Sequence, residues 1–258
     1  MEFSRAKGAQ RYAYLLIRRL VVRGPRPGLG PKDIAVEQRA LAPNERSLGV
    51  QRDDVEMRVV RVPWSFLAAL RSTCDKLAPE SWPMLCHEWG IQWGRRAAVD
   101  LESAALERHA KALRELTMRT VADLVAEALR DEGWGRTSFD FSRSRAGIVS
   151  IDVERSALAE STRLTRPRTS EDPPRPEAFA CHLLAGCLGA ILTHVAQRRL
   201  VVREVYCAAA PPRGSTRGAT CTFVAAGARR RRALESAIES GARDAESIQH
   251  ALASGVAS

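Results

Sequence analysis

"ACHLLAGCLGAILTHVAQRRLVVREVYC", residues 180–207, joins a predicted helix to a predicted strand and carries the residues on which fold and function depend. The helix covers about residues 178–197, and the strand runs from Val201 to Cys207. Glu204 interrupts the β-branched residues of this strand, three positions before Cys207. Because a buried carboxylate without a partner is costly, Glu204 either faces solvent or lies beside a positive charge.

A second predicted strand, residues 219–227, carries Cys221. A hairpin between the two strands brings Cys207 and Cys221 together, and the start of the preceding helix, with Cys181, can lie across that end of the sheet. Three thiolates and one carboxylate suit a closed tetrahedral zinc site. Buried thiols with a solvent-facing Glu204 are the alternative, and spacing alone leaves both open.

Two geometric conditions apply to this cluster. Glu204 and Cys207 fall on opposite faces of a flat strand, because side chains alternate with a period of two. The strand must therefore bend or end at Cys207. Cys187 lies six residues after Cys181, about 120° around a helix, so both cannot easily bind one ion. Cys187 is accordingly interpreted as a core residue.

The rest of the chain reads as helices followed by paired strands, twice over. An apolar repeat makes residues 101–131 the strongest helical pattern. The other predicted elements are a strand within 55–63, helices at 64–77, from about 83 and at 229–240, and a hairpin of 137–141 with 148–153. Together they predict an α+β fold in which helices flank an antiparallel sheet.

Three regions are expected along the chain. Residues 1–54 are basic and contain a segment rich in Pro and Gly, so we expect a poorly ordered extension. Residues 55–240 form the α+β domain, and residues 241–258 form a weakly helical tail. A loop rich in proline is expected at residues 165–177.

The composition indicates which classes of partner and which cellular compartment to expect. The 258 residues carry a net charge of +10. Only four of the 40 basic side chains are lysines, a ratio that coding bias explains more easily than selection for contacts with phosphate groups. Residues 1–31 hold seven basic side chains and one acidic one, and the run Arg229–Arg232 is typical of a solvated helix start, so nucleic acid is not an expected partner. No run approaches the roughly 18 to 20 apolar residues of a membrane span, and no secretory leader is recognised. A cytoplasmic protein is predicted, in which clustered cysteines suggest metal chemistry before disulfides.

Residues 180–207, with the later "CTF" at 221–223, resemble the C-terminal half of the 4-vinyl reductase domain family. That family is related in fold to the TRAPP vesicle-tethering subunits and to the sensor domains of phenol- and xylene-responsive bacterial activators. An earlier segment, "LCHEWGIQWG" at residues 85–94, resembles the helix of the family that carries two glycines four residues apart, and the similarity covers about residues 55–235. The positions that match the C-terminal pattern in order are Cys181, Gly186, Glu204, Cys207 and Cys221.

The resemblance implies a structural zinc ion beside a small-molecule pocket. In the aromatic sensors the positions equivalent to Cys181, Glu204, Cys207 and Cys221 bind that zinc, so Glu204 would be paired with a cation. One departure is the loop at residues 208–220, which is longer than the short loop of the family. A longer loop costs little closure entropy, but the metal could have been lost with the change.

The resemblance also places the ligand. The phenol-contacting aromatic positions of the sensors align with Val153 and Val202, which implies a more apolar ligand than phenol or a filled pocket. Trp89 and Trp93 share a helix face, so they either pack in the core or complete a mainly apolar pocket at the helix–sheet interface.

The sequence therefore predicts a small-molecule-binding sensor or regulatory module with a structural zinc ion. It would act through a partner protein or as a homodimer. The alternative is an enzyme or accessory protein for vinyl-group reduction of a tetrapyrrole. No nicotinamide or flavin fingerprint supports catalysis by this chain alone, and no catalytic residue is identified.

Overall fold

The computed structural model describes residues 51–52, 58–59, 64–77, 81–165, 179–211 and 218–253. Two compact units, residues 1–63 and 64–258, divide the chain. In the first unit, β1 (Gln51–Arg52) pairs antiparallel with β2 (Arg58–Val59). Only β2 lies within the strand expected at residues 55–63. The predicted extension at 1–54 otherwise lies outside the described residues, as does nearly all of the proline-rich loop at 165–177.

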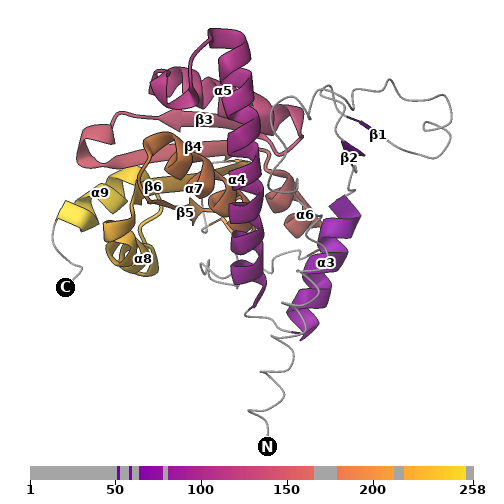
Figure 1. Cartoon of the computed structure of the whole chain (residues 1–258). Helices are drawn as coiled ribbons and strands as arrows, with labels where there is room; N and C mark the ends of the chain where they lie inside the picture. Colours follow the sequence, from indigo (N-terminus) through magenta and orange to yellow (C-terminus); the bar gives the residue numbers. More distant parts are fainter. Residues whose placement is uncertain are drawn as a thin grey trace, which may run out of the picture. The chain divides into compact units, whose positions relative to one another are not determined.

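A four-stranded antiparallel sheet forms the centre of the second unit (Figure 1). Its strands lie in the order β3 (Arg136–Asp140), β4 (Ile148–Glu154), β6 (Thr220–Gly227) and β5 (Leu200–Tyr206). Both predicted hairpins are present, β3 with β4 and β5 with β6, and β4 pairs with β6 to join them. The predicted antiparallel α+β fold is confirmed.

Side chains alternate across this sheet and supply two separate cores. Ile151, Val202 and Phe223 pack on one face, in a cluster with the helix α7 (His182–Ala196). Ile148 and Val224 pack on the other face, in a smaller cluster with α8 (Arg231–Glu239) and α9 (Ala245–Ala253). The sheet is therefore covered by helices on both faces.

The long helix α4 (Ser81–His109) packs across α7 (Figure 1). At the crossing the two backbones approach so closely that side chains have no room. A Cβ atom added to Gly90 would lie closer than 3.0 Å to Leu183 and Cys187 of α7, and one added to Gly186 would meet His87 and Ile91 of α4 equally closely. The glycines that matched the family pattern therefore make this close helix crossing possible.

The continuous helix predicted for residues 101–131 is wrong, because the chain breaks it between His109 and Met118. Ala110 adopts a left-handed conformation, with φ of 51°, and the buried Leu113 lies in a short 3-10 turn. Thr117 then caps α5 (Met118–Asp131) by accepting a 3.2 Å hydrogen bond from the backbone N–H of Thr120. The apolar repeat suggested one helix because the two helices bury apolar side chains in the same core. Leu106, which belongs to the repeat, is nevertheless 53% exposed.

Two further helices pack together away from the crossing. The helix α3 (Trp64–Leu77) has the predicted bounds, whereas α6 (Ala157–Thr165) was not predicted from the sequence. The two are joined by a hydrogen bond of 3.0 Å from the guanidinium of the buried Arg71 to the hydroxyl of Thr162. None of the described helices is long and apolar enough to cross a membrane.

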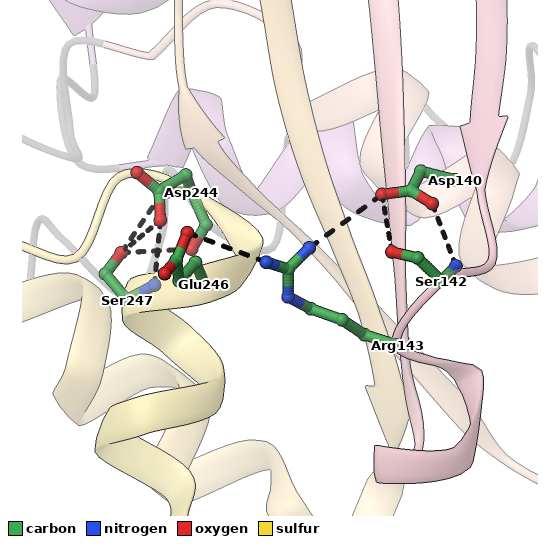
Figure 2. A network of polar contacts seen from close by, with 6 residues as sticks. All are labelled: Asp140, Ser142, Arg143, Asp244, Glu246 and Ser247. Carbon is green, nitrogen blue, oxygen red and sulfur yellow. Dashed lines mark hydrogen bonds and ion pairs between the residues drawn. The ribbon is translucent and has the colours of Figure 1, made fainter.

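A polar network connects the β3–β4 turn to α9 (Figure 2). The guanidinium of Arg143 lies between two carboxylates, 3.9 Å from Asp140 and 3.6 Å from Glu246. Asp140 also accepts a 2.8 Å hydrogen bond from the backbone N–H of Ser142, and that bond lowers the pKa of its carboxyl. This network and the buried Ile248 hold α9, which occupies residues 245–253 of the expected weakly helical tail.

Candidate metal centre

A β-bulge near the end of β5 turns Cys207 toward Cys221. Glu204 pairs with Phe223 but Tyr206 pairs with Thr222, so β5 contains one residue more than its partner strand between these two pairs. The extra residue changes the alternation of side chains, and β5 ends at Tyr206. Cys207 consequently enters the same core as Cys221. The predicted bend or end of the strand at Cys207 is present.

The structure brings together all four residues expected to hold a metal. One donor atom from each of Cys181, Glu204, Cys207 and Cys221 lies within 4.8 Å of the others, in the only such group among the described residues. The three cysteines are 0% exposed and Glu204 is 5% exposed. They come from the residue that precedes α7, from β5 and the residue that follows it, and from β6. This buried group could hold a metal ion.

Backbone N–H groups point at three of the four donors. The N–H of Cys181 donates to Glu204 Oε2 at 2.9 Å. The N–H of Ala180 donates to the sulfur of Cys207, and that of Ala208 to the sulfur of Cys221, each at 3.3 Å. Donors of this kind favour the deprotonated, metal-binding form of a thiol or a carboxyl.

The other oxygen of Glu204 has no such partner. Oε1 is buried and makes no hydrogen bond to any described residue. Burial raises the pKa of this carboxyl well above its usual value, chiefly because a charge is poorly solvated there. A bare carboxylate oxygen beside three sulfurs is an arrangement that a bound cation would satisfy.

Three of the four groups hold their protons tightly in the metal-free cluster, and one does not. Burial raises the pKa of Cys181, and raises that of Cys207 to about 12. Cys221 behaves in the opposite way, because hydrogen bonds from the thiols of Cys181 and Cys207 lower its pKa to about 6. The sulfur of Cys181 lies 3.6 Å from that of Cys221. Without a metal, the cluster thus contains one thiolate that the neighbouring thiols stabilise.

Cys187 lies apart from this cluster, as the helical spacing predicted. It is fully buried, and its backbone meets α4 at Gly94 in the crossing of α4 and α7. Burial raises the pKa of its thiol far above the usual value, so it remains protonated. Its role is packing.

The residues predicted to line an apolar pocket occupy two environments. Val153 and Val202 are buried in the main core, and Val153 lies directly opposite Cys221 on the neighbouring strand. Trp93 packs against Trp134 with ring centres 4.9 Å apart, and Trp89 meets Trp82 edge-on at 6.4 Å. Trp93 packs against the cluster that contains Val153 and Val202, whereas Trp89 is not among the residues of that cluster.

Sequence reasoning missed a cavity of about 380 Å³ next to the cluster. Its walls come from the start of α4, the start of α7, β5 and α8, and Glu204 is the one proposed metal ligand among its lining residues. Four segments distant in sequence build it, so no spacing pattern could have revealed it. Its polar lining includes His87, His182, Arg203, Arg231 and Glu235.

An ion-pair network forms part of the wall of this cavity. Arg203 donates two hydrogen bonds to Glu235 Oε1, at 3.1 and 2.6 Å, and Arg231 donates a third to the same oxygen at 3.0 Å. The two guanidiniums lower the pKa of the Glu235 carboxyl against the opposing effect of its burial. The network fixes β5 to α8 beside Glu204.

Known proteins resemble this chain in structure but not detectably in sequence. No protein-family model and no curated protein sequence matches this chain. The phenol-responsive sensory domain of the transcription activator PoxR, solved with phenol, is similar with a TM-score of 0.50 and 16% identity, over 71% of this chain and 87% of that domain. At this identity the similarity shows a shared fold, and the fold expected from the sequence resemblance is thereby confirmed.

Two other solved structures are similar with lower scores. One is a vinyl-4-reductase family protein from Methanocaldococcus jannaschii, with a TM-score of 0.39 and 13% identity over 65% of this chain and 82% of that one. The other is trafficking protein particle complex subunit 3 from Naegleria fowleri, covalently bound to palmitic acid, with a TM-score of 0.42 and 11% identity over 63% of this chain and 93% of that one.

Proposed function

We propose that the chain is a small-molecule-binding regulatory module whose fold is fastened by one zinc ion, held by Cys181, Glu204, Cys207 and Cys221. The observation that carries the proposal is the convergence of these four buried donors, with Glu204 Oε1 left without another partner. Each donor is oriented by the backbone of the sheet or by the start of α7. A bound cation would resolve the cost of burying the bare carboxylate oxygen.

The donor set favours zinc over harder cations. Thiolates are soft ligands that bind zinc well, whereas calcium and magnesium prefer shells made of oxygen. Four protein donors complete a tetrahedral shell, which is typical of structural rather than catalytic zinc. When bound, the ion would cross-link the start of α7 to the end of β5 and to β6.

The regulatory part of the proposal is supported by the shared fold with the PoxR sensory domain. The proposed site for an apolar or aromatic ligand is the interface between the helices and the sheet, where Val153 and Val202 belong to the main core and Trp93 packs against it. Because Val153 faces the same core as Cys221 on the adjacent strand, an occupant there would lie beside the metal cluster. The signal would pass to a partner protein or to a second copy of the chain.

Elemental analysis of protein purified without a histidine tag tests the metal. We expect about one zinc per chain, lost in Cys181→Ser, Glu204→Gln, Cys207→Ser or Cys221→Ser. Cys187→Ala is the matched control, because this thiol is equally buried but lies at the helix crossing, and it should keep the zinc. Folded wild-type protein without stoichiometric metal would refute the zinc site.

A thermal-shift series tests the ligand separately. Phenol, a xylene and a medium-chain fatty acid are added to the zinc-loaded protein, and binding should raise the melting temperature with concentration by mass action. Val202→Phe, which enlarges a core side chain, should abolish the shift while leaving the zinc content unchanged. If no apolar compound shifts the wild type, the ligand proposal fails and the metal proposal is unaffected.

A further inference from the structure

The buried cluster poses a problem of access. Its three cysteines are inaccessible to solvent, so an ion cannot reach them directly. Glu204 is the only one of the four that lines the adjacent cavity of about 380 Å³. A species that enters this cavity therefore meets Glu204 before it meets any thiol.

His182 provides a second acceptor in the same cavity. It follows Cys181 directly and lines the cavity at the first residue of α7. Its ring hydrogen-bonds to the backbone of Phe179, while Nε2 is buried and makes no hydrogen bond to a described residue. A neutral imidazole fixed in this way presents a bare lone pair, which is the form that binds metals.

The charges around the cavity select its occupant. The lone pairs of Glu204 Oε1 and His182 Nε2 repel an anion and attract a cation or a hydrogen-bond donor. Both arginines of the lining, Arg203 and Arg231, donate to Glu235. The carboxylates of Glu88, Glu235 and Glu239 outnumber these two guanidiniums in the lining.

We propose that this cavity is the route by which the metal enters and leaves the cluster, with His182 as a transient ligand and Glu204 as the ligand shared by both positions. The inference rests on the proposed zinc site. In the outer position, Glu204 and His182 would hold a partly hydrated divalent ion. Rotation of the Glu204 carboxylate would then bring the ion to the three sulfurs, and His182 would be released.

Transfer of the ion to the sulfurs exchanges one set of ligands for another. Bonds form between the ion and the sulfurs of Cys181, Cys207 and Cys221, and the bonds to the remaining water molecules and to His182 break. The protons of the thiols and of the Glu204 carboxyl leave to bulk solvent through the same cavity. No change of oxidation state is involved, and the reverse sequence releases the ion to a chelator.

Metal exchange kinetics test the route. Metal-free protein is mixed rapidly with Co²⁺, and formation of the cobalt–thiolate absorption band is followed, after which EDTA extracts the ion. His182→Ala should slow both loading and extraction by about tenfold or more, which corresponds to about 1.4 kcal/mol in the barrier. The final cobalt spectrum and the stoichiometry should equal those of the wild type.

Two further variants sharpen this test. His194→Ala is the matched control, because His194 lies near the other end of α7, bonded to Glu102 at 3.2 Å, and should leave both rates unchanged. Ala185→Leu places a larger side chain in the cavity wall without removing a ligand, and should also slow exchange. It serves as the second measurement if His182→Ala does not fold.

The outcomes separate the two proposals. Wild-type protein that binds no cobalt overturns the zinc site and the route together. Wild-type protein that loads normally, with unchanged rates in His182→Ala and Ala185→Leu, overturns the route alone. A changed spectrum or lost stoichiometry in His182→Ala would make His182 a permanent ligand and overturn its transient role.

Discussion

The first and second turns of α7 are buried in the same core but are stabilised in opposite ways. In the second turn, Gly186 faces α4 with no side chain, and the two helices meet backbone to backbone. At the first turn, Cys181 brings a thiol to a carboxyl and to two other thiols. The second turn requires a residue without a side chain, whereas the first turn requires particular donor atoms.

The cysteines of α7 make the difference measurable. Cys181 and Cys187 are both fully buried, yet only Cys181 has other thiols within reach. Burial alone keeps the Cys187 thiol protonated, whereas sulfur–sulfur hydrogen bonds leave a thiolate on Cys221 in the metal-free cluster. Equal burial therefore does not give equal chemistry, because the neighbouring groups decide which charge is tolerated.

Gly90→Ala should break the crossing and produce the largest effect. The added methyl group would collide with backbone atoms of Leu183 and Cys187, which cannot turn away as a side chain can. We expect a loss of more than about 3 kcal/mol in the free energy of unfolding, or no folded protein, measured by urea denaturation.

Gly189→Ala is the control for this prediction. The nearest atoms to its added Cβ, from Val202, lie at 3.8 Å, an ordinary contact. Because alanine favours a helix over glycine by roughly 1 kcal/mol, this variant should be as stable as the wild type or slightly more so. Cooperative unfolding of Gly90→Ala with wild-type stability would contradict the close crossing.

Removal of the metal should weaken the first turn without touching the crossing. A ligand present at a hundred times its dissociation constant stabilises the folded state by about 2.7 kcal/mol, so a strong chelator should lower the melting temperature of the zinc-loaded wild type. The measurement is a thermal melt with and without chelator. Cys207→Ser should melt at the lower temperature under both conditions.

Cys187→Ala should show the same chelator-induced shift as the wild type, although its own stability is lower because of the cavity created at the crossing. If the chelator removed zinc from the wild type without lowering its melting temperature, metal binding would not be coupled to this part of the fold.

A titration of the metal-free protein should distinguish the two kinds of buried thiol. Thiolate absorbance in the ultraviolet should rise by one equivalent around pH 6, because the pKa of Cys221 is lowered to about 6. Cys221→Ala should abolish that step, and Cys187→Ala should leave it in place. A titration with no step below pH 8 would refute the stabilised thiolate.

The same shift predicts the sign of one contribution to stability. The pKa of Cys221 is lower in the folded state than its usual value of 9.0, so the unfolded chain binds the proton that the folded chain lacks. This contribution is fully present above pH 9 and is lost as the pH falls through about 6. Zinc affinity should fall in the same direction, since protons compete for the sulfurs.

Arg143→Ala should give the smallest effect, at a site remote from both regions of α7. Its guanidinium is 30% exposed and Glu246 is 85% exposed, so solvent screens the pairing shown in Figure 2. We expect a loss of at most about 1 kcal/mol, with faster amide hydrogen exchange confined to α9. Zinc content should not change. A global loss of several kcal/mol would show that this network supports more than α9.

Local patterns in the sequence were sufficient for the strands and for the composition of the cluster. The strands that pair as two hairpins alternate or contain β-branched residues, and turn-forming residues separate them. Cys181, Glu204, Cys207 and Cys221 could be selected because soft donors near a helix start and two strand ends suit one metal. Cys187 could be excluded because the turn of a helix fixes its direction.

Tertiary packing decided what these patterns left open. The break at Ala110 escaped detection because both flanking helices bury apolar faces in one core. The bulge before Tyr206, which turns Cys207 toward its partners, depends on pairing with β6. The closeness of α4 and α7 at Gly90 and the cavity beside Glu204 arise only when distant segments meet. Sequence fixes the chemistry of individual residues and their local direction, whereas distances between segments depend on how the whole chain packs.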